Sequence, residues 1–80
     1  MKKTAVKIYT TPWCHWCKLT KEFFKEHKIN YKEIDVQDNE KAAKEMVDKS
    51  GQMGVPVINI GGKIIIGFDE QAIRKLLKIK

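Results

Sequence analysis

Apolar and polar positions alternate or repeat along the chain in patterns that separate strands from helices. Residues 6–10 (VKIYT) place a β-branched side chain at every second position, which is typical of a strand, and Pro12 ends it. From Cys14 to about His27, apolar residues recur every three to five positions among Lys and Glu, which predicts an amphipathic helix. The predicted buried face of this helix comprises Leu19, Phe23 and Phe24.

The middle of the chain predicts a second strand followed by a second helix. Residues 31–36 alternate again between polar and apolar side chains. Asp38 or Asn39 supplies the N-cap of the next helix, and Ser50-Gly51 ends it, since glycine adopts the left-handed conformation common just after a helix. The buried face of this helix is expected to pair Ala42 with Met46 and Ala43 with Val47.

The last third of the chain predicts a hairpin and a final helix. Two apolar runs, Val55–Ile60 and Ile64–Ile66, flank Gly61-Gly62-Lys63. These glycines permit the positive φ that tight hairpin turns need, so we expect the two strands to be antiparallel. Asp69 is the predicted N-cap of the last helix. The buried stripe of that helix is expected to comprise Ala72, Ile73, Leu76 and Leu77.

The resulting order, β-α-β-α-β-β-α, predicts an α/β fold. The first strand, helix and second strand make one right-handed βαβ unit, which the hairpin and the last helix complete. We expect a four-stranded mixed sheet flanked by three helices. The first and third helices should share one face of the sheet, and the second helix should cover the other.

Length and composition favour a single small domain, which we assign to residues 1–80. Of these 80 residues, 42% are hydrophobic and 32% are charged. A chain of this size buries only about 60 to 65% of its unfolded surface, so we expect no large internal cavity. No apolar stretch approaches the ~18 residues of a membrane span or forms the h-region of a signal peptide. We therefore expect a cytoplasmic monomer without a membrane partner.

The net charge of +6 indicates attraction to acidic partners. All but one of the sixteen basic residues are lysine, and they are scattered along the chain. Nucleic-acid interfaces usually favour arginine and clustered basic stripes, so a solvated surface is favoured and no nucleic-acid partner is expected.

Two cysteines, Cys14 and Cys17, form a C-x-x-C pair at the predicted start of a helix. They are too few and too close to staple a secreted protein, and in the reducing cytoplasm such a pair is more often catalytic or metal-binding. The unpaired N–H groups of a helix start favour an anion, so we expect the pKa of the Cys14 thiol to lie below the about 8.5 of a free cysteine. Cys17, one turn further on, should be more buried and should resolve the mixed disulfide that Cys14 forms.

The residues around the pair admit two interpretations each. His15 either stabilises the Cys14 thiolate and makes the disulfide more oxidising, or it is an exposed spacer without an electrostatic role. Trp13 and Trp16 either form a hydrophobic collar that docks partner proteins, or pack partly buried against the sheet.

A metal site is the main alternative chemistry for the cysteine pair. Structural zinc normally takes four protein ligands, and only His15 and His27 could join the two sulfurs. His15 lies between the cysteines, where it cannot comfortably close the same tetrahedron. An iron–sulfur cluster shared across a dimer would need two further ligands from elsewhere. We therefore expect no metal ligands in this chain.

Several motifs together resemble the glutaredoxins of the short, thioredoxin-fold type, across essentially the whole chain. They are the C-x-x-C pair, Gly54-Val55-Pro56, Ile60-Gly61-Gly62-Lys63 and Gly67-Phe68-Asp69. The resemblance implies that Pro56 is cis, and that Val55 offers its backbone groups to the substrate. It also implies that Phe68 and Asp69 lie at the helix start that binds the γ-glutamyl end of glutathione. Asp69 can equally serve as an N-cap only.

Departures from the usual glutaredoxin pattern affect the choice of reductant more than the redox chemistry. Thr11 replaces a common Lys, His15 a usual Pro, and Ile66 the first glycine of a Gly-Gly pair. Trp13 before the first cysteine resembles thioredoxin. Gly67-Phe68 resembles the Ser-Gly-Phe stretch of the glutaredoxin-like electron donors to ribonucleotide reductase, in which an Arg stands where this chain has Asp69.

We therefore expect a thiol–disulfide oxidoreductase that reduces disulfide-containing proteins or low-molecular-weight disulfides, with Cys14 as nucleophile and Cys17 as resolving thiol. No tightly bound cofactor is expected, and glutathione is a candidate reductant. One alternative is an electron donor to ribonucleotide reductase that thioredoxin reductase rather than glutathione reduces. A further alternative is a non-catalytic module that binds a metal or an iron–sulfur cluster.

Overall fold

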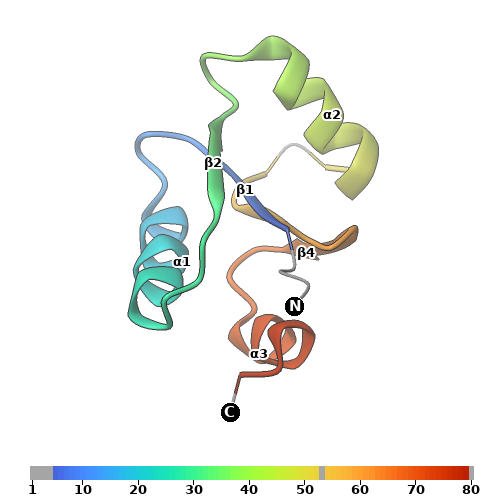
Figure 1. The fold of residues 1–80 in the computed structure, drawn as a ribbon. Helices are drawn as coiled ribbons and strands as arrows, with labels where there is room; N and C mark the ends of the chain where they lie inside the picture. Colours follow the sequence, from blue (N-terminus) through green and yellow to red (C-terminus); the bar gives the residue numbers. More distant parts are fainter. Residues whose placement is uncertain (1–4, 53, 80) are drawn as a thin grey trace.

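The computed structural model describes residues 5–52 and 54–79, and it contains the predicted elements in the predicted order (Figure 1). The strands are β1 (Val6–Thr10), β2 (Lys32–Asp35), β3 (Val57–Ile60) and β4 (Lys63–Ile66). The helices are α1 (His15–Glu26), α2 (Glu40–Ser50) and α3 (Glu70–Leu77). Within these described ranges, no helix has the length and apolar character needed to cross a membrane.

The four strands form one mixed sheet in the order β2-β1-β3-β4. β1 runs parallel to β2, with Tyr9 opposite Ile34. It runs antiparallel to β3, with Ile8 opposite Ile58, and β3 is in turn antiparallel to β4. The parallel pair arises from the crossover through α1, whereas the antiparallel β3–β4 pair is the predicted hairpin. The predicted α/β class with a four-stranded mixed sheet is therefore confirmed.

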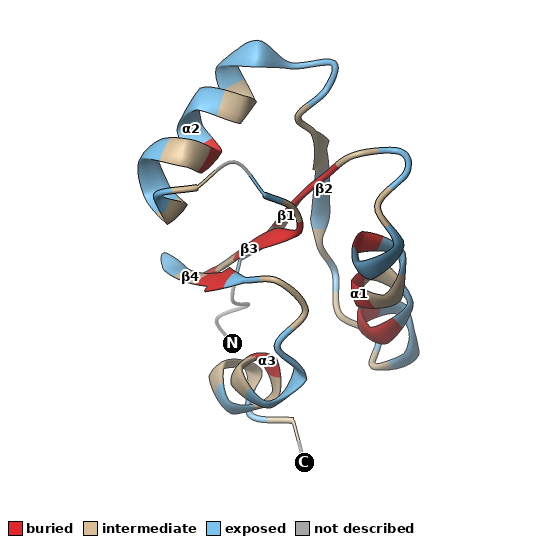
Figure 2. Ribbon diagram, turned by 180° about the vertical axis from the view of Figure 1, so that it is seen from behind, coloured by how far each residue is buried: buried red, intermediate tan, exposed pale blue. Residues whose placement is uncertain are grey.

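Helices cover both faces of the sheet, because alternate strand residues point to opposite sides. On one face, Ile8 and Ile58 are buried against Phe24 of α1 and Ile73 of α3. On the other face, a smaller cluster packs Tyr9 and Val57 against Met46 of α2. Figure 2 shows the buried residues concentrated in the central strands and on the inner side of each helix. The predicted sharing of one face by the first and third helices is confirmed.

Element boundaries differ from the sequence-based expectation where local contacts decide them. Lys63 pairs with Ile60 and so belongs to β4, which leaves a two-residue turn of Gly61 and Gly62, both with positive φ. Asn39, not Asp38, caps α2, and its side chain accepts a hydrogen bond from the Ala42 N–H at 3.0 Å. The predicted strands at residues 31–36 and 55–60 are shorter, at Lys32–Asp35 and Val57–Ile60.

The buried face of α1 also differs from the prediction in one position. Leu19 is only half-buried, whereas Cys17 and Thr20 are buried beside Phe23 and Phe24. Thr20 tolerates burial because its hydroxyl donates a hydrogen bond to the Trp16 carbonyl at 2.8 Å. The buried face of α1 therefore includes Cys17. Packing of this face holds Cys17 in place relative to the sheet.

Candidate functional site

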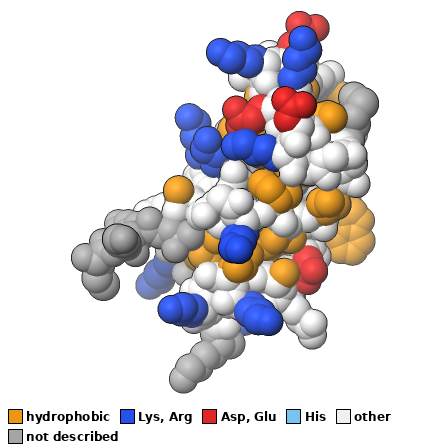
Figure 3. Space-filling view, turned by 90° about the vertical axis from the view of Figure 1, so that its right-hand side faces the viewer, with side chains coloured by type: hydrophobic (Ala, Val, Ile, Leu, Met, Phe, Trp, Pro, Cys, Tyr) orange, Lys and Arg blue, Asp and Glu red, His pale blue; other side chains and the backbone are white. Residues whose placement is uncertain are grey.

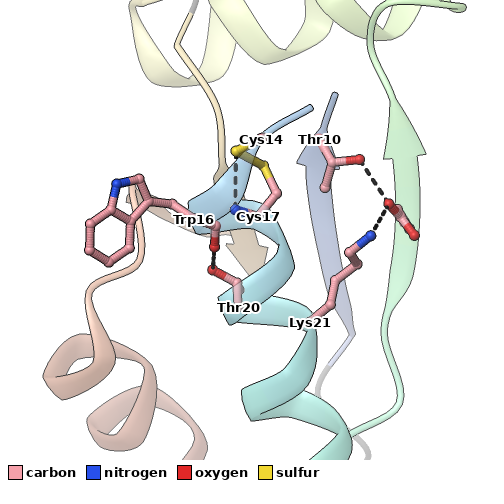
Figure 4. Close-up of a disulfide and its surroundings, with 7 residues drawn as sticks. Thr10, Cys14, Trp16, Cys17, Thr20 and Lys21 are labelled. Carbon is pink, nitrogen blue, oxygen red and sulfur yellow. Dashed lines mark hydrogen bonds and ion pairs between the residues drawn. A yellow bond between two sulfur atoms is a disulfide. The ribbon is translucent and has the colours of Figure 1, made fainter. Parts of the chain in front are cut away.

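The first cysteine is the residue that begins α1. After β1, a short turn closes where the Cys14 N–H donates to the Thr11 carbonyl at 3.2 Å. Cys14 has an extended backbone conformation and acts as the N-cap of α1, with its carbonyl accepting from the Lys18 N–H. Its sulfur accepts a hydrogen bond from the Cys17 N–H at 3.0 Å, as Figure 4 shows. The side chain that caps this helix is thus the sulfur itself.

The two cysteines are joined by a disulfide, with their Cα atoms 5.2 Å apart. Cys17 is 1% exposed, whereas Cys14 is partly accessible. The prediction that Cys17 is the more buried of the two is therefore confirmed. An incoming sulfur can approach Cys14 from solvent, while Cys17 is shielded by the body of the protein.

The aromatic residues around the pair are exposed. Trp13 is 72% and Trp16 is 57% exposed, so the interpretation in which they pack partly buried against the sheet is wrong. The Trp16 indole points away from the disulfide, toward the segment that leads to α3 (Figure 4). His15 is also exposed, and its ring lies edge-on to that of Trp16 at 5.8 Å. Among the described residues it makes no hydrogen bond to the Cys14 sulfur, and its tuning role stays a prediction.

A groove of about 530 Å³ lies beside Trp16 and brings together segments far apart in the sequence. The Val55–Pro56 peptide in its wall is cis, as the resemblance implied. The Pro56 carbonyl accepts from the Gly67 N–H at 2.8 Å, which ties this wall to the start of α3. The groove is lined by Trp16, Val55, Pro56, Ile66, Gly67, Phe68, Asp69, Glu70 and Gln71.

Phe68 and Asp69 hold the end of this first groove in place. The Phe68 ring contacts the Phe23 ring, with 5.7 Å between centroids, and so anchors the loop to α1. Asp69 is the N-cap of α3, and its carboxylate accepts from the Ala72 N–H at 3.1 Å, which confirms the predicted cap. The first groove thus contains the predicted binding residues Trp16, Val55, Pro56, Phe68 and Asp69.

A second groove, of about 520 Å³, lies on the other side of the cysteine pair. Cys14 lines this groove, together with Trp13 and His15. The structure therefore distributes the predicted binding residues over two grooves rather than one. The two tryptophans lie one on each side, because Trp16 lines the first groove and Trp13 the second.

An ion pair missed by the sequence analysis joins α1 to β2 beside the site. Lys21 Nζ lies 2.9 Å from Glu33 Oε2, and the Thr10 hydroxyl donates to the same oxygen at 3.0 Å (Figure 4). The hydrogen bond from Lys21 is the largest cause that holds the pKa of the Glu33 carboxyl below its usual range. Lys21 and Glu33 are twelve residues apart, and no sequence pattern predicts a contact at that spacing. The parallel pairing of β2 with β1 brings Glu33 beside α1.

The described ranges, residues 5–52 and 54–79, contain no group of three or more His, Cys, Asp or Glu side chains arranged to hold a metal ion. Within these ranges, no third side chain of these types joins the cysteine pair in such a group.

Comparison with known proteins agrees with this geometry. The profile of the glutaredoxin family matches residues 6–65. The chain belongs to the glutaredoxin family. It is 49% identical over 73 residues to an uncharacterized glutaredoxin-like 8.6 kDa protein in the rubredoxin operon of Clostridium pasteurianum. The matched region covers 91% of this chain and 97% of that protein.

Solved structures of glutaredoxin relatives show the same fold. The crystal structure of a variant of the thioredoxin-like protein BC3987 superposes with a TM-score of 0.89 at 30% identity and covers all of both chains. The glutaredoxin-like NrdH-redoxin from Escherichia coli, described as having a thioredoxin-like activity profile, gives a TM-score of 0.81 at 26% identity. That match covers 90% of this chain and 93% of the redoxin. Glutaredoxins are in general thiol–disulfide oxidoreductases that act on disulfides with glutathione or related reductants.

The ion pair of this glutaredoxin predicts an acid-sensitive contribution to stability. Because the pKa of Glu33 is lower in the folded than in the unfolded chain, its contribution is present above the ordinary pKa of 4.5 and is lost as the pH falls through the folded value. Glu33→Gln should therefore lower the free energy of unfolding at neutral pH, by less than about 1 kcal/mol since both side chains are partly exposed. Urea unfolding of the wild-type protein and of Glu33→Gln, at neutral and at acidic pH, measures the difference in free energy of unfolding. A difference that persists undiminished in acid would contradict the assignment.

Proposed function

We propose that this chain is a dithiol–disulfide oxidoreductase in which Cys14 is the nucleophile and Cys17 the resolving thiol. The Cys14 thiolate attacks one sulfur of a substrate disulfide and forms a mixed disulfide, while the other substrate sulfur leaves as a thiolate and takes a proton from water. Cys17 then loses its proton, attacks the Cys14 sulfur and expels the second substrate thiolate. Two electrons pass to the substrate, and the Cys14–Cys17 disulfide remains.

The observation that carries this proposal is the capping of α1 by the Cys14 sulfur. That sulfur accepts the Cys17 N–H and is partly accessible, whereas the Cys17 sulfur is buried. A helix start stabilises a negative sulfur, and the thiolate is the form that attacks disulfides. The division of labour between attack and resolution follows from this difference in environment and accessibility.

We assign substrate binding to Trp13, His15, Trp16, Val55, Pro56, Phe68 and Asp69. The first groove supports this for Val55, because the half-buried Val55 lines it together with the exposed Trp16. Trp13 and His15 flank Cys14 in the second groove. The substrates are disulfide-containing proteins or low-molecular-weight disulfides, and residues 1–80 act as one domain in a reducing, cytoplasmic environment.

A second candidate concerns the reductant, and a specific observation favours it. Ile66 lines the first groove and is 51% exposed, which makes the groove wall beside Phe68 apolar. The fold is shared with an NrdH-redoxin of thioredoxin-like activity profile, and the chain has Trp13 before its first cysteine. We therefore infer reduction by a thioredoxin reductase, with glutathione as the alternative, and an electron donor to ribonucleotide reductase as the corresponding function.

The two cysteines should respond differently to substitution. Cys14→Ser should abolish reduction of a protein disulfide such as those of insulin, because no attacking thiolate remains. Cys17→Ser should stop turnover but leave a trapped mixed disulfide at Cys14, which mass spectrometry of the quenched reaction detects. Trapping at Cys17 in the Cys14→Ser variant, or equal trapping in both variants, would contradict the assignment of roles.

The two reductant systems should differ in rate. With NADPH as the electron source, thioredoxin reductase should reduce the oxidised protein at least about tenfold faster than glutathione with glutathione reductase, which corresponds to about 1.4 kcal/mol in activation free energy. NADPH consumption at equal protein concentration measures both. Faster recovery with glutathione would overturn the choice of reductant while leaving the dithiol mechanism intact.

A further inference from the structure

The second groove continues from the cysteine pair along the exposed side of α1. Its lining includes Cys14 and, along α1, Lys18, Lys21 and Lys25. These positions follow the cysteine by four, seven and eleven residues, a spacing that keeps side chains on one stripe of a helix. The row of lysines therefore begins at the residue proposed as the nucleophile, and we call this surface the lysine groove.

The charges of the lysine groove are unbalanced. Its lining has three lysines against one acidic residue, Glu22. Lys21 is paired with Glu33 of β2, whereas Lys18 and Lys25 are exposed and form no ion pair with any residue in the described part of the chain. The start of α1, which has no acidic residue in its first turn, adds the positive end of the helix dipole. Beside the hydrogen bond from Lys21, the charge of Lys25 also helps to lower the pKa of the Glu33 carboxyl. Lys18 and Lys25 are thus the lysines of this groove without a direct ion-pair partner in the described part of the chain.

Lysine side chains are also frequent on other parts of the surface (Figure 3). Figure 3 shows the face that points away from α1, where lysine side chains are interspersed with acidic and hydrophobic ones. On α2, for example, Lys49 lies 3.7 Å from Glu45. A further groove, beside α2 and β2, is lined by Lys7, Lys32 and Lys41 against one acidic residue, Glu45, so an excess of lysine is not confined to the α1 side. The lysine groove differs in that Cys14 is part of its lining.

We propose that the lysine groove docks an acidic polypeptide segment of the protein whose disulfide Cys14 attacks. The inference rests on the proposed dithiol function and adds a substrate class to it. Along the helix axis, Lys18 lies ~6 Å and Lys25 ~16 Å from Cys14. An extended chain advances ~3.4 Å per residue, so its carboxylates should lie about two and about five residues from the attacked cysteine.

Two synthetic peptides test the proposal. Each carries one cysteine activated as a mixed disulfide with 2-thiopyridine, and either Glu or Gln two and five residues after the cysteine. Cys14 of the reduced protein attacks the peptide sulfur and releases thiopyridone, whose absorbance gives the rate. Cys17 then releases the peptide thiol, so a single turnover needs no other reductant.

The expected result is a ratio of rates. At low ionic strength, wild-type protein should react about three- to tenfold faster with the Glu peptide than with the Gln peptide, and added salt should bring the ratio toward one. In Lys18→Gln/Lys25→Gln the ratio should be near one at all salt concentrations. The matched control Lys41→Gln/Lys44→Gln, which removes the same charge from α2, should keep the wild-type ratio.

Other outcomes separate this inference from the function on which it rests. Equal rates with both peptides in the wild-type protein would overturn the lysine groove as an acidic docking site, while the dithiol mechanism would stand. Loss of the ratio in the α2 control would assign the preference to net charge and would also overturn it. If a single-stranded oligonucleotide slows both peptides equally and no Glu preference exists, the groove serves a phosphate chain instead. Absence of thiopyridone release altogether would reject the dithiol function and the docking site together.

Discussion

The hydrogen bond from the Cys17 amide to the Cys14 sulfur joins the backbone of α1 to the chemistry of the thiol pair. The first N–H groups of any helix lack partners within the helix, and a capping side chain usually accepts one of them. Here that side chain is the disulfide-bonded Cys14 sulfur, and we propose that the same contact stabilises the Cys14 thiolate in the reduced protein. The other predicted site residues can act on a substrate only if they lie within reach of this sulfur.

The rest of the fold holds that contact in place and shapes access to it. Phe24 fixes α1 against the sheet, and Lys21 links the same helix to Glu33 at the edge strand β2. Grooves then open on both sides of the helix start. The first groove presents apolar side chains such as Ile66 and Phe68, whereas the lysine groove presents cationic side chains. A substrate that touches both would contact an apolar wall on one side and cationic side chains on the other.

The sequence predicted the elements well because each has a clear period and a clear end. The residues of β1 alternate, and Asp69 and Gly51 mark helix boundaries, so fold class, topology and the sharing of a sheet face by α1 and α3 could be anticipated. Features that depend on strand register or on the packing of helices could not be anticipated from the sequence. Lys63 joins β4 only because it pairs with Ile60, and the separation of the predicted binding residues into two grooves follows from the three-dimensional position of α1.

The central claim is that the start of α1 stabilises a negative Cys14 sulfur, and the pH dependence of alkylation in the reduced protein tests it most directly. With iodoacetamide as reagent and peptide mapping as readout, Cys14 should react with a midpoint clearly below the about 8.5 of a free cysteine, and Cys17 should react far more slowly. Cys17→Ser retains the amide donor and should leave that midpoint low. A Cys14 midpoint equal to that of a free cysteine in both proteins would contradict the account.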